Sequence, residues 1–135
     1  MTKFVVKGNH KLKGRIRVSG SKNAALPIIC ASLLTKEKTT LKNVPDIADI
    51  HSLLKIINSL GVKTEFENHT LVIDAAKMHK QNLPDELIKK MRASILIIPA
   101  LLHRFSEVKM AFPGGCVLGK RSVSAHTEAF LKLGV

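Results

Sequence analysis

Apolar residues recur every three or four positions over much of the chain, which is the spacing of amphipathic helices. This spacing predicts helices over residues 24–34, 46–60, 85–105 and 124–133. Asn23 and Asp46 stand at the starts of the first two, where a side-chain oxygen can accept a backbone N–H and cap the helix. Gly61 ends the second helix, because glycine readily adopts the backbone conformation that closes a helix.

Short apolar or alternating runs between these helices predict β-strands. They cover residues 4–6, 15–18, 39–44, 62–66, 70–73 and 108–112. The first two runs are separated by turn-prone residues, so we expect a hairpin in residues 1–20. The fourth and fifth runs flank Glu67-Asn68-His69 and predict a second hairpin. Helices that alternate with strands in this way indicate an α/β fold.

The sequence contains an internal duplication. In each copy a Leu-Leu pair is followed by a strand and a proline, Pro45 or Pro113, and the two prolines are sixty-eight residues apart. The helix after each proline ends in the triplet Leu-Gly-Val, at residues 60–62 and 133–135. One unit is therefore helix, strand, helix and hairpin.

The first copy covers about residues 21–75, and the second covers about residues 84–135 without its hairpin. The second copy also has five extra residues between its proline and its triplet, in the segment that contains Gly114, Gly115 and Cys116. Extra length in a loop favours a functional role for that loop. We expect the chain to be the front portion of a longer protein.

The segment 113–121 places Cys116 among three glycines and just before Lys120 and Arg121. Glycines let backbone N–H groups turn towards an anion, and nearby cations favour the thiolate. Cys116 is therefore a candidate nucleophile or proton donor. The alternative is a structural cysteine in a tight turn.

Lys22 and Arg92 are candidate ligand-binding cations. Lys22 stands beside a predicted helix N-terminus, where N–H groups and an ammonium can converge on an anion. The alternative is a solvated lysine in a turn, which would give the same sequence pattern. Arg92 leads an otherwise apolar segment, which is costly unless an anion satisfies it. A core ion pair or a side chain that reaches solvent would explain Arg92 equally well.

Lys and Arg outnumber Asp and Glu by 22 to 10, so the chain should attract anions. A basic anion- or nucleic-acid-binding module is therefore a rival interpretation. The chain has no Trp or Tyr, however, and its basic residues are spread rather than clustered, so a platform for stacking bases is missing. No apolar run is long enough for a membrane span, and we predict a cytoplasmic location. We interpret the two cysteines as reduced thiols, and two cysteines alone cannot form a zinc site.

Three motifs resemble one known family along the whole chain, in order and with matching spacing. They are residues 21–28 (SKNAALPI), residues 91–95 (MRASI), and residues 113–116 (PGGC) with Gly119 and Arg121. The family is UDP-N-acetylglucosamine 1-carboxyvinyltransferase, the enolpyruvyl transferases that open bacterial peptidoglycan synthesis. The cysteine loop distinguishes this family from the enolpyruvyl transferases of the shikimate pathway.

The resemblance implies an inverted α/β barrel built from βαβαββ units, with two lobes in the complete enzyme. Residues 21–135 would be an incomplete lobe, and residues 1–20 a hairpin that belongs to the second lobe. The implied reaction transfers enolpyruvate from phosphoenolpyruvate to the 3-hydroxyl of UDP-N-acetylglucosamine and releases phosphate. It needs no cofactor or metal.

The resemblance also assigns residues. Phosphoenolpyruvate would be bound by Lys22, Asn23, Cys116 and Arg121. The catalytic proton donor would be Cys116, which in the family is alkylated by fosfomycin. The nucleotide sugar would be bound by Arg92, Arg121, Ser122, Val123, Ser124 and Ala125.

The chain departs from the family in the last of these segments. The family usually reads Arg-Pro-Val-Asp-Leu, whereas residues 121–125 read Arg-Ser-Val-Ser-Ala, so Ser124 can keep a hydrogen bond but not the charge. The family's general base, an aspartate of the second lobe, is also missing from these residues. We therefore expect the chain alone to be inactive, and an inactive truncated gene product is a further alternative.

Overall fold

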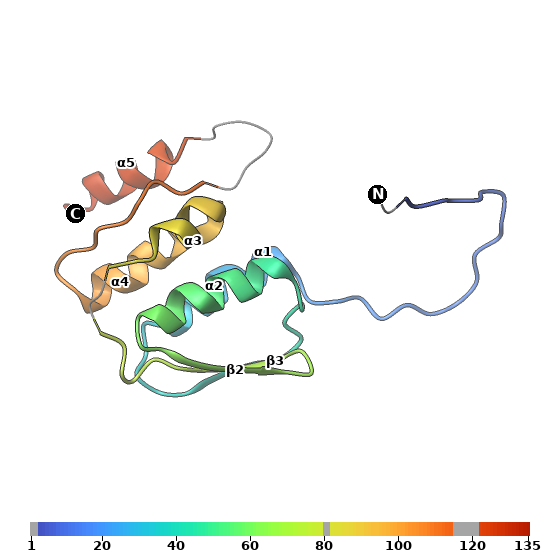
Figure 1. The fold of residues 1–135 in the computed structure, drawn as a ribbon, viewed down its shortest axis with the longest axis horizontal. Helices are drawn as coiled ribbons and strands as arrows, with labels where there is room; N and C mark the ends of the chain where they lie inside the picture. Colours follow the sequence, from blue (N-terminus) through green and yellow to red (C-terminus); the bar gives the residue numbers. More distant parts are fainter. Residues whose placement is uncertain (1–2, 80–81, 115–121) are drawn as a thin grey trace.

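The computed structural model describes residues 3–79, 82–114 and 122–135. Nine elements follow one another in this part of the chain (Figure 1). They are α1 (Lys22–Ser32), β1 (Thr39–Leu41), α2 (Ala48–Ser59), β2 (Lys63–Glu67), β3 (Thr70–Asp74), α3 (Asp85–Lys90), the 3₁₀ helix η1 (Arg92–Ile97), α4 (Ile98–Arg104) and α5 (Ser124–Lys132).

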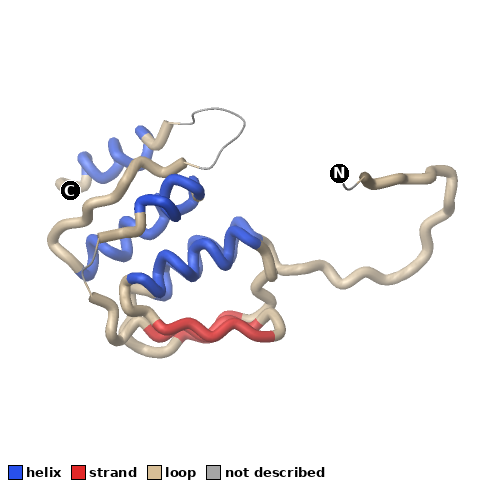
Figure 2. The backbone as a smooth tube through the Cα atoms, viewed as in Figure 1, coloured by secondary structure: helices blue, strands red, loops and turns tan. Residues whose placement is uncertain are grey.

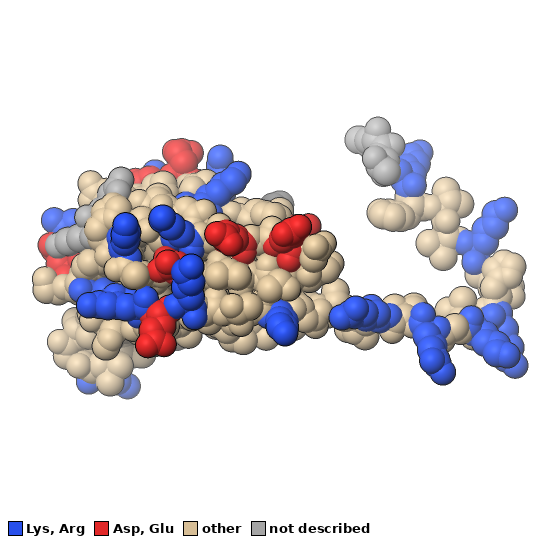
Figure 3. Space-filling view, turned by 90° about the horizontal axis from the view of Figure 1, so that it is seen from below, with Lys and Arg blue, Asp and Glu red and all other residues tan. Residues whose placement is uncertain are grey.

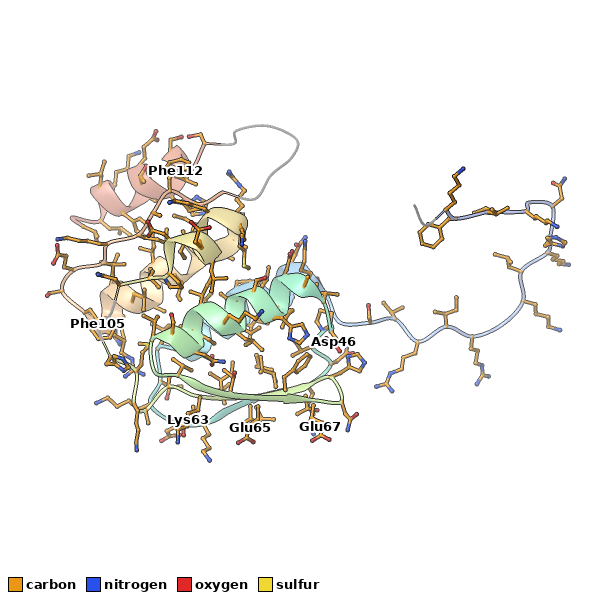
Figure 4. All side chains as sticks on the ribbon, in the orientation of Figure 1. Asp46, Lys63, Glu65, Glu67, Phe105 and Phe112 are labelled. Carbon is orange, nitrogen blue, oxygen red and sulfur yellow. The ribbon has the colours of Figure 1, made fainter. Side chains whose placement is uncertain are left out.

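The three strands form one antiparallel sheet in the order β1-β3-β2, which lies under the helices (Figure 2). Asn68 and His69 both adopt positive φ angles, 48° and 60°, as the two-residue turn of a tight hairpin requires. Lys63, Glu65 and Glu67 are exposed on the side of β2 away from the helices (Figure 4). The predicted second hairpin is confirmed.

The core lies between the sheet and the helices, and it continues from the first copy of the repeat into the second. Ile88 and Ile97 of the second copy are fully buried. So are five side chains of the helices of the first copy, Ile29 of α1 and Ile50, Leu53, Ile56 and Ile57 of α2. Arg104 of α4 joins the two copies by donating Nε–H to the Leu33 carbonyl at 2.9 Å and Nη2–H to the Thr35 carbonyl at 2.6 Å. These carbonyls follow the end of α1, where an arginine can satisfy the groups that the helix leaves unpaired.

Two helices end in the same way, at corresponding positions of the two copies. Gly61 has a φ of 83° and Gly134 a φ of 81°. In both, the residue after the glycine donates its N–H to the carbonyl five residues earlier, at 3.4 Å after α2 and 3.0 Å after α5. This is the Schellman motif, and its recurrence agrees with the duplication read from the sequence.

The helix starts differ from prediction. Ser21, not Asn23, caps α1, because the Ser21 hydroxyl accepts the Ala24 N–H at 3.3 Å and Asn23 lies inside the first turn. Asp46 does not cap α2, whose N-cap position is Ile47. The Asp46 carboxylate instead lies 2.6 Å from Nε2 of His51, one turn into the helix.

Three predicted strands are absent from the described residues. The hairpin of residues 4–6 and 15–18 does not form, and residues 3–20 extend away from the body, with Phe4 97% exposed (Figure 1). Residues 108–112 also form no strand. A strand needs a hydrogen-bonded neighbour, and none of the three runs pairs with another strand in the described residues. Val108, Met110 and Ala111 pack against the core all the same. The mixed α/β class is confirmed, whereas the barrel and the assignment of residues 1–20 to a second lobe stay predictions.

Candidate functional site

Lys22 lies in the first turn of α1, as expected for an anion-binding lysine, but it has a carboxylate partner. Its Nζ is 2.7 Å from Oδ2 of Asp49, which lies in the first turn of α2. The two side chains are about half exposed, at 47% and 46%. The N-terminal ends of α1 and α2 therefore lie together, and their partial positive charges face the same solvent region.

Sequence reasoning missed Asp49. Its only local signal is an acidic residue in the first turn of a helix, which is common because carboxylates are stabilised there. The pairing joins residues twenty-seven positions apart and depends on how α1 and α2 pack, which no local pattern encodes.

Arg92 and Ser122 are two predicted site residues that the structure brings together. Nη2 of Arg92 donates to the Ser122 carbonyl at 2.7 Å. Val123 is buried, Ser124 donates its N–H to the Ser122 hydroxyl at 2.9 Å, and Ser124 and Ala125 are exposed at the start of α5. Residues 122–125, which are predicted to bind the nucleotide sugar, thus begin at Ser122, whose carbonyl is hydrogen-bonded to Arg92.

The predicted helix 85–105 is interrupted just before Arg92. Met91 is extended, with φ −132° and ψ 109°, so α3 ends there and η1 begins. Ser94 is fully buried, and its hydroxyl donates to the Met91 carbonyl at 2.6 Å. A serine that bonds a nearby carbonyl stabilises a non-helical backbone, which explains the break.

Gly114 marks the start of the glycine-rich segment and packs tightly against the end of α3. Its N–H donates to the Ile88 carbonyl at 3.3 Å. A Cβ on this residue would lie 1.8 Å from the Lys89 carbonyl oxygen, so only glycine fits. Gly20 is in a similar position, since its Cβ would lie 1.7 Å from the carbonyl oxygen of Asn43.

Cys116 and Arg121 lie outside the described residues, so their predicted roles stay predictions. The other cysteine, Cys30, is a free thiol in α1 that is 2% exposed. Burial raises its pKa to about 12, because the thiolate would lose its hydration. Cys30 is therefore an inert thiol and a useful internal reference for Cys116.

The remaining chemistry of the described residues is limited. They contain no group of His, Cys, Asp or Glu side chains that could hold a metal ion. No helix among them is long and apolar enough to cross a membrane. On the face shown in Figure 3, lysines and arginines are interspersed with acidic residues over the body, and a row of basic residues follows the N-terminal segment.

Comparisons with known proteins agree on one family. The EPSP synthase (3-phosphoshikimate 1-carboxyvinyltransferase) family matches residues 6–135. UDP-N-acetylglucosamine 1-carboxyvinyltransferase from Acinetobacter guillouiae is 45% identical over 134 residues, covering 99% of this chain and 32% of the relative. The protein of the same name from Buchnera aphidicola subsp. Baizongia pistaciae is 48% identical over the same shares of the two chains.

A solved structure extends the agreement to the fold. The crystal structure of the enolpyruvyl transferase NikO from Streptomyces tendae matches with a TM-score of 0.65 and 26% identity, over 72% of this chain and 23% of that one. The chain thus spans about a third of the length of the curated relatives, and the match is to their N-terminal portion. Because the family match extends over nearly all of its residues, the chain belongs to the EPSP synthase family.

Proposed function

We propose that this chain contributes to the transfer of enolpyruvate from phosphoenolpyruvate to the 3-hydroxyl of UDP-N-acetylglucosamine, with release of phosphate. The observation that carries the proposal is the 45% identity, across 134 residues, with a UDP-N-acetylglucosamine 1-carboxyvinyltransferase. The reaction is the first committed step of peptidoglycan synthesis, and we place it in the cytoplasm.

Lys22 and Asn23 bind phosphoenolpyruvate in this proposal. Their place in the first turn of α1 supports it, because free backbone N–H groups and the helix dipole favour an anion there. An ammonium has three donors, so Lys22 can bond Asp49 and a phosphate or carboxylate oxygen together.

Cys116 is the proposed proton donor. The substrate's 3-hydroxyl oxygen adds to C2 of phosphoenolpyruvate while C3 takes a proton from the thiol, and elimination of phosphate with loss of a C3 proton then restores the double bond. Arg121 neutralises anionic oxygen during these steps, as its planar fork of donors allows. The base that accepts the 3-hydroxyl proton belongs to the second lobe.

Arg92, Arg121 and residues 122–125 bind the nucleotide sugar in this proposal. The contact between Arg92 and the Ser122 carbonyl supports a shared location for them. Ser124 has no charge to offer, so we expect weaker nucleotide binding than in relatives with an aspartate at that position.

The complete reaction needs the second lobe, and we expect no turnover from these residues alone. A nucleic-acid-binding module is less favoured, because the basic residues of the body are interspersed with acidic ones (Figure 3). An inactive truncated product would lack a preformed cysteine site.

Fosfomycin labelling tests the proposal. The thiolate opens the epoxide and forms a thioether, so peptide mapping should find the adduct on Cys116 and not on Cys30. A Cys116→Ser variant should take up no label. Equal modification of both cysteines, or of neither, would count against a preformed enolpyruvyl transferase site.

A second assay tests the need for the other lobe. Phosphate release from phosphoenolpyruvate is measured with and without UDP-N-acetylglucosamine, and no nucleotide-dependent release is expected. Release that depends on the nucleotide sugar would show that these residues suffice.

A further inference from the structure

The two described ends of the cysteine-bearing segment are fastened to one short stretch of chain. Gly114, before the segment, bonds the carbonyl of Ile88, and Ser122, after it, accepts a bond from Arg92. Ile88 and Arg92 are only four residues apart. Both attachments therefore depend on the geometry of the break between α3 and η1.

This break is built into the core. Ile88 and Ser94 are fully buried, and Met91 is 6% exposed. The Ser94 hydroxyl bonds the Met91 carbonyl at 2.6 Å and lies 3.5 Å from the Ile88 carbonyl oxygen, the same oxygen that accepts from Gly114. A buried polar group with its hydrogen bonds satisfied favours one local conformation.

The chain beyond Ser122 has little else to hold it. No side chain of α5 is buried, and Leu131 and Leu133 are more than 70% exposed. Val123 is the buried residue next to Ser122. Among the described residues, the bond from Arg92 and the burial of Val123 are thus the main attachments at the start of α5.

We propose that Arg92 is a positioning residue, which fastens Ser122 and α5 to the break between α3 and η1. Through Ser122 it fixes, relative to Gly114, the point where the described chain resumes at residue 122. The tether itself is a property of the fold and needs no substrate. Its importance for the reaction of Cys116 rests on the function proposed above. An arginine suits this task because its guanidinium is always charged, and a charge-assisted bond to a carbonyl is stronger than a neutral one.

Amide hydrogen exchange measured by NMR on the whole chain tests the tether without any substrate. In Arg92→Ala we expect amides of α5 to exchange about tenfold faster, since one charge-assisted hydrogen bond is lost. Amides of β3 and α2 should keep their relative protection.

Arg104→Ala is the matched control. Arg104 also donates to backbone carbonyls, those of Leu33 and Thr35, but it lies at the other end of the second copy's helices. It should leave the exchange of α5 unchanged. Equal acceleration by both substitutions would indicate general destabilisation and overturn the proposal, as would α5 exchange in Arg92→Ala that matches the unmodified chain.

Arg92→Lys keeps the proposal testable if Arg92→Ala does not fold. Lysine retains the charge but not the planar fork, so the acceleration at α5 should be smaller than tenfold but measurable. If Arg92→Ala does not fold and Arg92→Lys shows no faster exchange at α5, the result would count against the tether. Fosfomycin labelling that fails while α5 loosens as expected would reject the proposed function and leave the tether standing.

Discussion

Lys22 and Asp49 are joined by a 2.7 Å contact between Nζ and Oδ2, which connects the first turns of α1 and α2. A lysine expected to meet a substrate anion thus already has an anion beside it. The pair keeps the ammonium close to both helix N-termini, where the proposed phosphoenolpyruvate site lies.

Asp49→Asn should change the free energy of unfolding by less than about 1 kcal/mol, because ion pairs between half-exposed side chains are screened by solvent. Urea unfolding measures this. Asp85→Asn, which affects the exposed pair of Asp85 with Lys89, serves as a control of similar exposure. A loss of several kcal/mol would mean that the Lys22–Asp49 pair is much less hydrated than its exposure indicates.

Gly20→Ala should destabilise the fold by about 1–3 kcal/mol, because its Cβ would overlap the Asn43 carbonyl oxygen and the backbone must shift. Gly8→Ala is the control, since nothing lies within 4 Å of a Cβ at that position. Denaturant unfolding of the two variants should separate them clearly. Equal stabilities would show that the contact between Gly20 and Asn43 is not closely packed.

The buried thiol of Cys30 predicts a loss of stability at high pH. Its pKa is raised from 9.0 to about 12 on folding, so the folded state keeps a proton that the unfolded state loses. The resulting stabilisation is complete below pH 9 and declines between pH 9 and 12, by up to about 1.4 kcal/mol per pH unit.

Cys30→Ala removes this contribution. Unfolding free energies of the original chain and the variant, measured from pH 8 to 11, should differ by an amount that varies above pH 9. A difference that stays constant with pH would contradict the raised pKa. Maleimide labelling at pH 8 should also leave Cys30 unmodified in the folded chain.

Arg104→Ala should cost about 1.5–3 kcal/mol, because the carbonyls of Leu33 and Thr35 lose charged donors. Thermal or urea unfolding tests this, with Lys36→Ala, an exposed basic residue nearby, as the control. Arg104→Lys should recover part of the loss. If alanine and lysine are equally tolerated, water replaces the guanidinium at the end of α1.

The elements that the sequence predicts well are those defined by local periodicity. Helices α1, α2 and α5 and the hairpin of β2 and β3 need only their own side-chain spacing and turn residues. The strands expected at 4–6, 15–18 and 108–112 failed because a strand is completed by a neighbour.

The site shows the same division. The sequence predicted ligand-binding roles for Lys22 and Arg92, and these roles stay predictions. The structure places Arg92 against Ser122. The sequence did not reveal Asp49 or the buried bonds of Ser94, because these depend on contacts between distant elements or on burial inside a predicted helix. The roles of Cys116 and Arg121 stay predictions.

Gly20 and Gly114 each make a crowded contact with a backbone carbonyl. Gly20 stands just before the first copy and its helix α1, and it faces the Asn43 carbonyl. Gly114 lies in the second copy, directly after Pro113, and faces the Lys89 carbonyl. At both places the Cβ of any other residue would overlap a backbone carbonyl oxygen. A side chain at either position would therefore push two backbone segments apart, residue 20 from residue 43 or residue 114 from residue 89.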